Sequence, residues 1–442
     1  MYTRYTSFEE LTDDFLNREG IAVRYAGEDD EIVEVSYPEL AAMIFSRTDE
    51  LRAECADVEV IRAAQTIDTV VDIFAHVIAG CDVVMADPMV PQDAVDRTMI
   101  AAIGARSVRL STRDARGRII VSRKEGELLF FTSGTTSRSK IVRLTSESFC
   151  TSAWSGQSML ACGEGDVILS VLPLAHVFGF VCSLLWGLAY GATVALGRGI
   201  GRIGEDAWLF RPTILPAVPS IIGGMLKADA FNPELKIVLI GAAPCRPETV
   251  AALREKGIAT YLGYGLTETA SGIAITQDLD EPEALYPCPG ADFIIEKDGE
   301  VAVATPCMMQ GYIGAIPMFD GDRFYTGDIG SIDEKGRLHL VGRKKDVLLL
   351  ESGTKVFCPE YEEDLTEMTG VTDLGLILKR GHIELIAGPG TDEEALRKAV
   401  AEYNQQLPGS LQIHDVIISV APLPRTRTGK LKRYELQEKY SR

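Results

Sequence analysis

The stretch LKIVLIGAAPCRPETVAALREKGIATYLGYGLTETAS, from Leu235 to Ser271, contains a regular succession of local patterns. The apolar run LKIVLI predicts a buried strand that enters a glycine turn, and RPETVAALREKG predicts the helix that follows. The segment ATYLGYG then predicts the next strand and turn. A strand, a covering helix and a second strand in succession are typical of a parallel sheet, so this stretch predicts an α/β fold.

The same alternation extends through the first three quarters of the chain. TVVDIFAHVIAG predicts a helix that ends at Gly80, and CDVVMAD predicts the strand after it. The charge-free segment 167–197 is long enough for a membrane span of ~20 residues. However, it contains Pro173 and His176, and it divides into a strand, a buried helix, a turn at Gly191 and a second strand. We therefore expect core elements here and no transmembrane segment.

The pattern changes from about Gly299 onward. Short alternating strands with turns such as DEKG predict a small antiparallel subdomain. After the charged segment GRKKD, two helical and three strand-like stretches predict a small α+β unit. We therefore expect a large N-terminal domain at 1–343 with mostly parallel sheets covered by helices, a charged boundary segment at 344–346, and a small C-terminal domain at 347–442.

Composition argues against several kinds of partner. The 442 residues are 46% hydrophobic and carry a formal net charge of -20. Such an acidic chain is a poor match for nucleic acid or for an anionic membrane, both of which need clustered Lys and Arg. The nine cysteines form no CxxC pair, and the N-terminus is polar and acidic. These features predict buried structural thiols, a reducing compartment and a cytoplasmic location.

The loop FFTSGTTSRSK, from Phe130 to Lys140, is rich in Ser and Thr and follows the strand-like run ELLFF. Backbone N–H and hydroxyl donors beside a glycine form a cradle for phosphate oxygens, and Lys140 adds a positive charge. The spacing GxxxxGK[ST] of a P-loop is absent. Taken alone, the loop is either a phosphate site or a polar surface turn.

Three further segments follow this loop: YLGYGLTETAS at Tyr261–Ser271, YTGDIGSIDEKGRLHLVGRKKD at Tyr325–Asp346 and LPRTRTGKLKR at Leu423–Arg433. In this order, the four segments resemble the signature motifs of the adenylate-forming (AMP-binding) superfamily, in an acyl-CoA synthetase-like chain. The resemblance covers roughly residues 60–442. It implies that a small-molecule carboxylic acid reacts with ATP and Mg2+ to give an acyl-adenylate and pyrophosphate, and that the acyl group then passes to a thiol.

The resemblance assigns nucleotide-binding roles to residues of each motif. Glu268 matches the magnesium ligand, and Thr267 beside it matches a catalytic hydroxyl donor to the α-phosphate. Tyr264 offers a ring face for adenine, and Asp328 resembles the ribose-binding aspartate. The other nucleotide contacts that the resemblance implies are Thr132, Ser133, Gly134, Thr135, Thr136, Lys140, Gly241, Ala242, Ala243, Gly265 and Arg343.

The C-terminal motif contains the lysine that the resemblance makes catalytic. Without the match, Lys430 in RTRTGK would be interpreted as a solvated charge. In the family, this lysine reaches the carboxylate and the α-phosphate only when the small domain closes over the site. The small domain then rotates to build the thiol-transfer site. The resemblance thus makes 1–343 the AMP-binding domain, 344–346 a hinge that aligns with Lys345, and 347–442 a mobile lid.

The acyl pocket is indicated by LPLAHVFGF, from Leu172 to Phe180. His176 matches a gating histidine, with a core histidine as the alternative, and Gly263 lets the backbone pass close to the substrate. Amino-acid-activating members carry an Asp in this segment, but here the neighbours of His176 are apolar. An unpaired ammonium would be costly to bury, so we expect an apolar acid, fatty or aryl.

The sequence therefore predicts an ATP-dependent acid–thiol ligase that uses coenzyme A. Two alternatives remain open: an enzyme that loads the phosphopantetheine of a carrier protein, and a non-catalytic nucleotide-binding homologue. Ser137, Ser139, Ile141 and Cys358 depart from the family pattern, in the phosphate loop and near the expected thiol channel. The sequence specifies neither the acid nor the oligomeric state.

Overall fold

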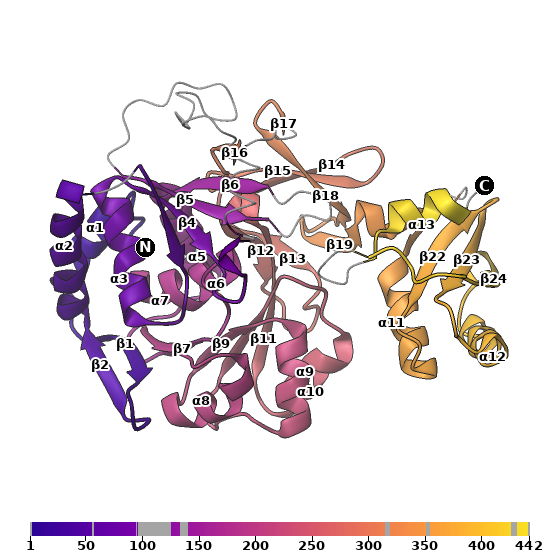
Figure 1. The fold of residues 1–442 in the computed structure, drawn as a ribbon, viewed down its shortest axis with the longest axis horizontal. Coiled ribbons are helices and arrows are strands. Elements are labelled where there is room, and N and C mark those ends of the chain that lie inside the picture. The colour runs from indigo at the N-terminus through magenta and orange to yellow at the C-terminus, as the bar shows by residue number, and fades with distance from the viewer. Residues whose placement is uncertain are drawn as a thin grey trace.

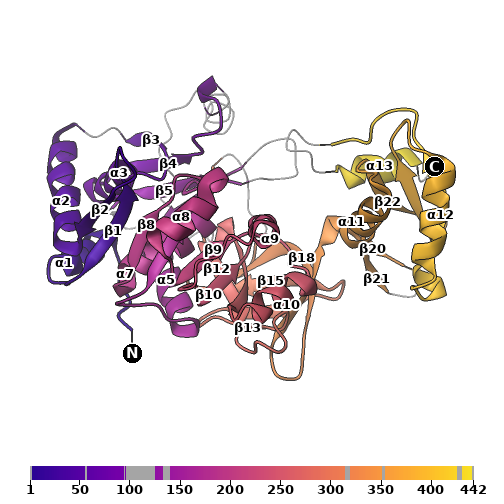
Figure 2. The same cartoon turned by 90° about the horizontal axis from the view of Figure 1, so that it is seen from below.

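The computed structural model has a large part and a small part (Figure 1). The described residues are 2–54, 57–93, 95, 125–132, 140–313, 319–350, 354–425 and 431–440. The small part follows strand β19 (Leu338–Arg343), and it lies to one side of the large part in both ribbon views (Figure 2).

The larger sheet has 14 strands and changes from parallel to antiparallel at β11 (Ala259–Leu266). On one side of β11, the strands in spatial order are β10 (Ile237–Ile240), β9 (Ile214–Ala217), β7 (Val167–Ser170), β8 (Thr193–Leu196), β1 (Ile21–Ala26) and β2 (Ile32–Ser36). All of them except the edge strand β2 are parallel to their neighbours. This half is the predicted parallel sheet.

On its other side, β11 continues into antiparallel strands. In spatial order they are β12 (Ser271–Thr276), β13 (Leu285–Pro287), β19, β18 (Arg323–Ile332), β15 (Glu300–Ala304) and β14 (Asp292–Ile295), with β17 (Phe319–Asp320) paired to β18. The predicted antiparallel subdomain is therefore a continuation of the large sheet, because β11 has a parallel neighbour on one side and an antiparallel neighbour on the other.

The opening stretch of the sequence folds as predicted. Strand β10 leads into α10 (Pro247–Glu255) and then into β11, with Ile237 paired to Ala259. Leu253 of α10 is fully buried in an apolar cluster with Val238 of β10, which holds the helix against the sheet. The other helices of this region are α5 (Ser146–Met159), α8 (Ile203–Phe210) and α9 (Pro219–Ala228), with 3-10 turns η2 (Ile200–Arg202) and η3 (Thr267–Thr269).

The charge-free segment forms the predicted core elements. Between β7 and β8 the chain is one helix with three parts: α6 (Val177–Phe180), the π-helical turn η1 (Val181–Leu185) and α7 (Trp186–Tyr190). It ends at Gly191, whose positive φ of 86° suits a residue without a side chain. The π turn itself was not predicted. Within the described part of the chain, no helix combines the length and the apolarity that a bilayer crossing requires.

A second sheet of five strands lies beside the first. Its order is β16 (Gly311–Ile313), β6 (Ile141–Thr145), β5 (Glu127–Phe131), β4 (Asp82–Ala86) and β3 (Val58–Arg62). Strands β3, β4 and β5 are parallel, and β6 and β16 are antiparallel additions. Helices α1 (Phe8–Phe15), α2 (Tyr37–Glu54) and α3 (Ile67–Ala79) pack together at this end of the molecule, and α3 ends at Gly80 as predicted.

The small part contains the two helices and three strands that the sequence indicated. They are α11 (Cys358–Thr369), α12 (Glu393–Asn404), β22 (Leu374–Lys379), β23 (His382–Ala387) and β24 (Ile413–Ile418). A further helix, α13 (Arg433–Tyr440), was not predicted; the remaining elements are the hairpin β20 (Val347–Leu349) and β21 (Lys355–Phe357) and the turns η4 (Lys344–Asp346) and η5 (Gly409–Leu411). The domain bounds 1–343, 344–346 and 347–442 stay a prediction.

The cysteines follow the prediction with one exception. Among the described residues, the thiols of Cys150, Cys162, Cys182, Cys245, Cys288, Cys307 and Cys358 are free. Burial raises the pKa of the Cys307 thiol to about 11 and that of Cys358 to about 12. The exception is Cys81, which is disulfide-bonded, so the prediction of a structural thiol is wrong at this position. Absence of a CxxC pair does not exclude a disulfide between cysteines distant in sequence.

A buried ion pair attaches α13 to the small part. The guanidinium of Arg433 donates from Nη1 to Glu362 Oε1 at 2.6 Å and from Nη2 to Oε2 at 3.0 Å, and both side chains are largely buried. We expect Arg433→Met to destabilise the small part by ~3–5 kcal/mol, because it leaves the Glu362 carboxylate buried without its cation. All three tryptophans precede residue 209, so amide hydrogen exchange in β22 is the suitable measurement.

The matched control is Arg397→Met on α12. Arg397 also has two carboxylate partners, Glu393 and Asp415, both at 2.9 Å, but its side chain is about half exposed. An exposed pair is typically worth less than ~1 kcal/mol. Equal losses in the two variants would show that the burial of the Arg433 pair is unimportant.

Candidate active site

Three strands of the antiparallel half bring Tyr264, Asp328 and Arg343 together. The Tyr264 hydroxyl on β11 donates to Asp328 Oδ2 on β18 at 2.7 Å. Arg343 at the end of β19 faces Asp328 directly in the strand register, and its Nε lies 3.0 Å from Asp328 Oδ1. Thr326 closes the turn, since its hydroxyl accepts from the Asp328 N–H at 3.0 Å. The carboxylate is thus held from both sides.

The burial of Asp328 determines its electrostatics. The residue is only 5% exposed, and burial raises the pKa of its carboxyl above the usual value, although the Arg343 charge and the Tyr264 hydrogen bond act in the opposite direction. Burial likewise raises the pKa of Tyr264, so this phenol remains a donor. A carboxylate of this kind is a strong acceptor for paired hydroxyl groups such as those of a ribose.

A second cluster lies around Glu268, on the 3-10 turn that directly follows β11. The Tyr312 hydroxyl donates to Glu268 Oε1 at 2.6 Å, and the Lys140 ammonium lies 4.6 Å from the centre of the Tyr312 ring. Glu268 also contributes to the charge environment of Asp328, so the two clusters are electrostatic neighbours. Sequence reasoning missed Tyr312, because it lies on a strand of only three residues.

Part of the predicted phosphate site can be placed. Thr132 and Lys140 are joined by hydrogen bonds: the Thr132 N–H donates to Lys140 O at 2.9 Å, and the Lys140 N–H donates to Thr132 Oγ1 at 3.3 Å. This pairing continues the β5–β6 ladder. Ser133, Gly134, Thr135 and Thr136, with the departures Ser137 and Ser139, lie outside the described residues, as does the predicted catalytic lysine, Lys430.

Backbone geometry marks the two loops after β10 and β11. Ala242 has φ of 66°, and Ala270 and Ser271 have φ of 50° and 99°. A positive φ is uncommon for residues with a Cβ, and such strain concentrates at functional sites. Gly265 has a structural reason that the sequence did not show: a Cβ there would lie 1.9 Å from the Ser271 carbonyl oxygen of the paired strand.

The predicted acyl segment lies next to the GAAP loop. Gly241 is buried, and a Cβ on it would lie 3.0 Å from the Phe178 ring, so Phe178 occupies the space over this loop. A Cβ on Gly263 would meet Leu239 at 3.6 Å. His176 is exposed, which removes the alternative of a core histidine. Desolvation by the neighbouring protein nevertheless lowers the pKa of His176, while the negative charge of Asp87, directly after β4, opposes that shift.

The remaining predicted site residues can also be placed. Ala243 is exposed on the GAAP loop after β10, and Lys345 is exposed within the turn η4. Thr267 is partly buried on η3, next to Glu268. The structure therefore brings Thr267, Glu268, Tyr264, Asp328 and Arg343 to neighbouring positions around the end of β11.

A magnesium site at Glu268 is chemically reasonable. Mg2+ in nucleotide enzymes takes one or two carboxylates from the protein and completes its shell with phosphates and water. Among the described residues no group of three or more His, Cys, Asp or Glu side chains could hold a metal by itself. Glu268 beside Lys140 fits a metal that arrives with a nucleotide.

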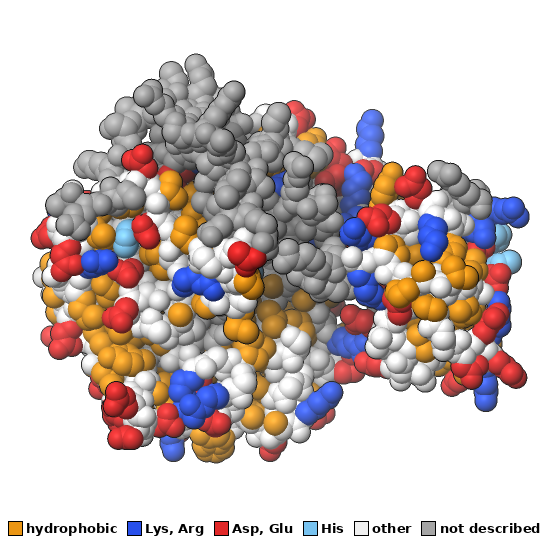
Figure 3. Space-filling model, in the orientation of Figure 1, with side chains coloured by type: hydrophobic (Ala, Val, Ile, Leu, Met, Phe, Trp, Pro, Cys, Tyr) orange, Lys and Arg blue, Asp and Glu red, His pale blue; other side chains and the backbone are white. Residues whose placement is uncertain are grey.

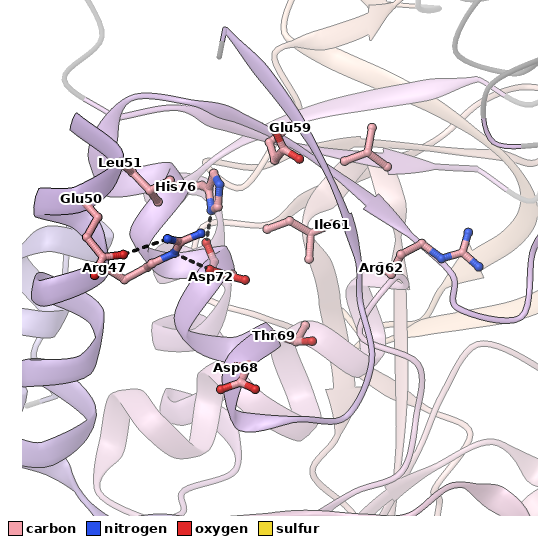
Figure 4. A pocket seen from close by; sticks show the side chains of 11 residues that line it. Arg47, Glu50, Leu51, Glu59, Ile61, Arg62, Asp68, Thr69, Asp72 and His76 are labelled. Carbon is pink, nitrogen blue, oxygen red and sulfur yellow. Dashed lines mark hydrogen bonds and ion pairs between the residues drawn. The ribbon is translucent and has the colours of Figure 1, made fainter. Parts of the chain in front are cut away.

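A cavity of about 720 Å3 lies away from these clusters, between α2, α3 and β3 (Figure 4). Arg47 in its wall is paired with Asp72 and Glu50, each at 2.9 Å. His76 Nδ1 lies 2.7 Å from the Asp72 carbonyl oxygen. None of the predicted site residues lines this cavity.

On the face in Figure 3, acidic and basic side chains are interspersed over the large part.

Comparison with known proteins identifies relatives of this chain. The family model described as AMP-binding enzyme matches residues 120–313. A 2-succinylbenzoate–CoA ligase of Listeria monocytogenes is 28% identical over 71% of this chain and 70% of its own length. A 3-[(3aS,4S,7aS)-7a-methyl-1,5-dioxo-octahydro-1H-inden-4-yl]propanoyl:CoA ligase of Mycobacterium tuberculosis is 31% identical over 79% of this chain and 73% of its own.

Solved structures show the same fold. The O-succinylbenzoate coenzyme A synthetase of Bacillus subtilis in complex with AMP superposes with a TM-score of 0.77, at 22% identity, over 96% of this chain and 97% of that one. An anthranilate CoA ligase in complex with anthranoyl-AMP also has a TM-score of 0.77, at 16% identity, over 100% and 98% of the chains.

The raised pKa of Asp328 leads to a prediction that separates stability from binding. Asp328→Asn should unfold at the same temperature as the wild type or slightly higher at pH 7, because it removes a charge whose burial is unfavourable. The difference should grow as pH rises from the usual Asp pKa of ~3.9 to the raised value, and stay constant above it. Affinity for ATP should fall roughly ten- to a hundredfold through the lost charged hydrogen bonds.

Asp333→Asn is the matched control, because the Asp333 carboxylate has the opposite shift. The backbone N–H of Arg337 and the side chains of His339 and Arg337 lower the pKa of Asp333. This variant should lose stability at pH 7, and the loss should vanish as pH falls through the usual Asp range toward the lowered value. Its ATP affinity should be unchanged. Thermal unfolding across pH with ATP titration compares the pair, and a destabilised Asp328→Asn at pH 7 would contradict the assignment.

Proposed function

This chain belongs to the adenylate-forming family of AMP-binding enzymes and is an acid–thiol ligase of the AMP-forming type, and we propose that it converts an apolar ring-bearing carboxylic acid to its acyl-adenylate and then to its coenzyme A thioester. The observation that carries the proposal is the buried carboxylate of Asp328 between Tyr264 and Arg343, next to Glu268. It provides a ribose acceptor beside a candidate metal ligand.

In this proposal, Asp328 accepts both ribose hydroxyls. Arg343 keeps the Asp328 carboxylate oriented and, being half exposed, also presents charge toward the sugar and phosphates. The Tyr264 hydroxyl is already committed to Asp328, so its role in binding is a ring edge or face for adenine and a rigid link between β11 and β18. Gly241, Ala242 and Ala243 complete the adenine side of the site.

The cluster around Glu268 is proposed to bind the phosphates and the metal. Mg2+, when bound at Glu268, would neutralise phosphate charge that otherwise repels the incoming carboxylate. Thr267 is positioned on the same turn to donate its hydroxyl to the α-phosphate, and Lys140 adds a fixed positive charge. Bringing two anions together is the electrostatic difficulty of the first half-reaction, and donors already in place reduce it.

Lys430 is proposed to act from the small part. It lies three residues before α13, which Arg433 attaches to Glu362. We assign the hinge to Lys345 in the turn η4, between β19 and β20. A rotation there would move Lys430 away from the α-phosphate after adenylation and open the path for the thiol.

The nature of the acid is inferred from the surroundings of His176. Phe178 lies against Gly241, and the residues on either side of His176, Ala175 and Val177, are buried and apolar. The acids in the names of the related CoA ligases contain rings, which favours an aryl acid over a fatty acid. Coenzyme A is the acceptor in those names, which favours it over a carrier protein.

Asp87 is the observation that favours a second candidate substrate. It is the acidic group that acts on the charge of His176, and its Oδ1 accepts the Met89 N–H at 2.8 Å. An acid that also bears an amine could pair with this carboxylate. The apolar acid remains the better proposal, because Asp87 lies directly after β4 and not on the segment Leu172–Phe180 that is proposed to line the acyl pocket.

The substrate proposal predicts the order of acids in ATP–pyrophosphate exchange. Benzoate-type acids should be activated at least tenfold better than alanine, since an unpaired buried ammonium costs more than ~1.4 kcal/mol. Octanoate tests the fatty alternative in the same assay. A preference for alanine that disappears in Asp87→Asn would replace the apolar acid by an amino acid, and no exchange with any acid would overturn the proposed function.

Lys430→Ala should separate the two half-reactions. Loss of a contact made in the adenylation transition state typically costs ~2.7–4 kcal/mol, or roughly a hundred- to a thousandfold in rate. Thioester formation from a presynthesised acyl-adenylate should be nearly normal. Both rates are measured on one preparation, with the neighbouring variant Lys432→Ala as control, because Lys432 is paired with Glu435 on the surface at 2.8 Å. Equal losses in both steps would contradict the alternation of domain positions.

A further inference from the structure

Tyr312 lies between two residues with proposed roles and has none itself. Its hydroxyl donates to Glu268 Oε1 at 2.6 Å, and the Lys140 ammonium lies 4.6 Å from its ring centre. The side chain is partly buried. A phenol is neutral at ordinary pH and its hydroxyl carries one proton, so Tyr312 donates that proton in the hydrogen bond to the Glu268 carboxylate.

The backbone before Tyr312 fixes Glu268 a second time. The Met309 N–H donates to the Glu268 carbonyl oxygen at 2.8 Å, and the Gln310 N–H donates to the Arg143 carbonyl oxygen at 2.8 Å. Met309 itself is 3% exposed in the main apolar core. Strand β16 then pairs with β6, placing Tyr312 opposite Val142. One short segment therefore holds both the main chain and the side chain of Glu268.

We propose that Tyr312 is a positioning residue that orients the Glu268 carboxylate for a divalent metal and keeps the Lys140 ammonium off that carboxylate. The inference rests on the metal role of Glu268 in the proposed function. A neutral phenol on Oε1 leaves the negative charge and the second oxygen for a metal, whereas a lysine ion pair would neutralise the charge. The ring face offers Lys140 a separate place close by.

Tyr312→Phe tests the hydroxyl, because it keeps the ring under Lys140. Removing the partner of a metal ligand typically costs 10–100-fold in metal affinity or activity. We expect the Mg2+ concentration for half-maximal pyrophosphate exchange to rise by about that factor, with a rate at saturating Mg2+ within about threefold of the wild type. Glu268→Gln is the benchmark, and its loss should persist at saturating Mg2+.

A second readout does not depend on turnover. Mn2+ is titrated into the full-length protein saturated with a non-hydrolysable ATP analogue, and the relaxation of water protons reports Mn2+ held on the protein. Tyr312→Phe should weaken this Mn2+ binding by about the same factor, while the affinity for the analogue without metal stays within twofold. A merely structural tyrosine would lower both affinities together.

The chain contains a matched control. The Tyr403 hydroxyl on α12 donates to Asp364 Oδ2 at 3.0 Å, so Tyr403→Phe also removes a phenol from a carboxylate, but in the small part. Its Mn2+ and Mg2+ dependence should equal that of the wild type. Thermal unfolding of both variants verifies that each is folded.

Tyr312→Leu tests the ring. It should show the metal defect of Tyr312→Phe and a further rise of at least about threefold in the half-saturating ATP concentration at saturating Mg2+, because Lys140 loses its place and pairs with Glu268. Wild-type metal dependence in Tyr312→Phe would overturn the inference, as would equal ATP constants in the two Tyr312 variants. If Mn2+ binding falls in Tyr312→Phe as expected but the wild type activates no acid, the proposed function fails and the inference stands.

Discussion

A buried carboxylate must be paired, and the pairing of Asp328 determines how the site is built. Its two partners come from different strands: Tyr264 from β11 and Arg343 from β19. This is possible because β11 is parallel to β10 on one side and antiparallel to β12 on the other. The parallel half provides the loop after β10, and the antiparallel half provides Asp328 and Arg343. A change in strand direction within one sheet thus brings distant motifs to one place.

The relatives confirm the predicted family, fold class and enzyme class. These predictions were possible because they rest on local sequence patterns. Apolar runs, helix periodicity and the glycine at position 80 act within a few residues, and LKIVLIGAAP folds as the strand and turn that it indicates. The segment ATYLGYG also folds as a strand, and Thr267 and Glu268, which the family resemblance identified, lie on the turn η3 that follows it. The roles of individual site residues remain proposals, since sequence patterns carry no distances.

What the sequence could not predict depends on contacts between distant segments. Tyr312 lies 44 residues after Glu268 on a three-residue strand, too short for an alternating pattern. The disulfide at Cys81 and the close approach of Gly265 to Ser271 on the paired strand β12 likewise depend on a partner that the sequence pattern does not show. The exposure of His176 also contradicts the alternative of a core histidine, which the sequence left open. These properties depend on how separate elements pack in the fold, and the local periodicity of the sequence does not specify that packing.

The two clusters differ in the kind of partner that holds the carboxylate, and the ligands proposed for them, a ribose at Asp328 and a divalent metal at Glu268, account for the difference. Asp328 has an arginine beside it because hydroxyl groups of a sugar do not need its full negative charge, and the pair can persist when the sugar binds. Glu268 has a neutral phenol because a divalent cation is attracted by the charge itself. Exchanging the partners would weaken both sites: an arginine on Glu268 would compete with the metal, and a phenol alone on Asp328 would leave a buried charge without a cation. With the roles proposed for Asp328 and Glu268, the distribution of charge around β11 therefore matches the different requirements of a sugar and a divalent metal.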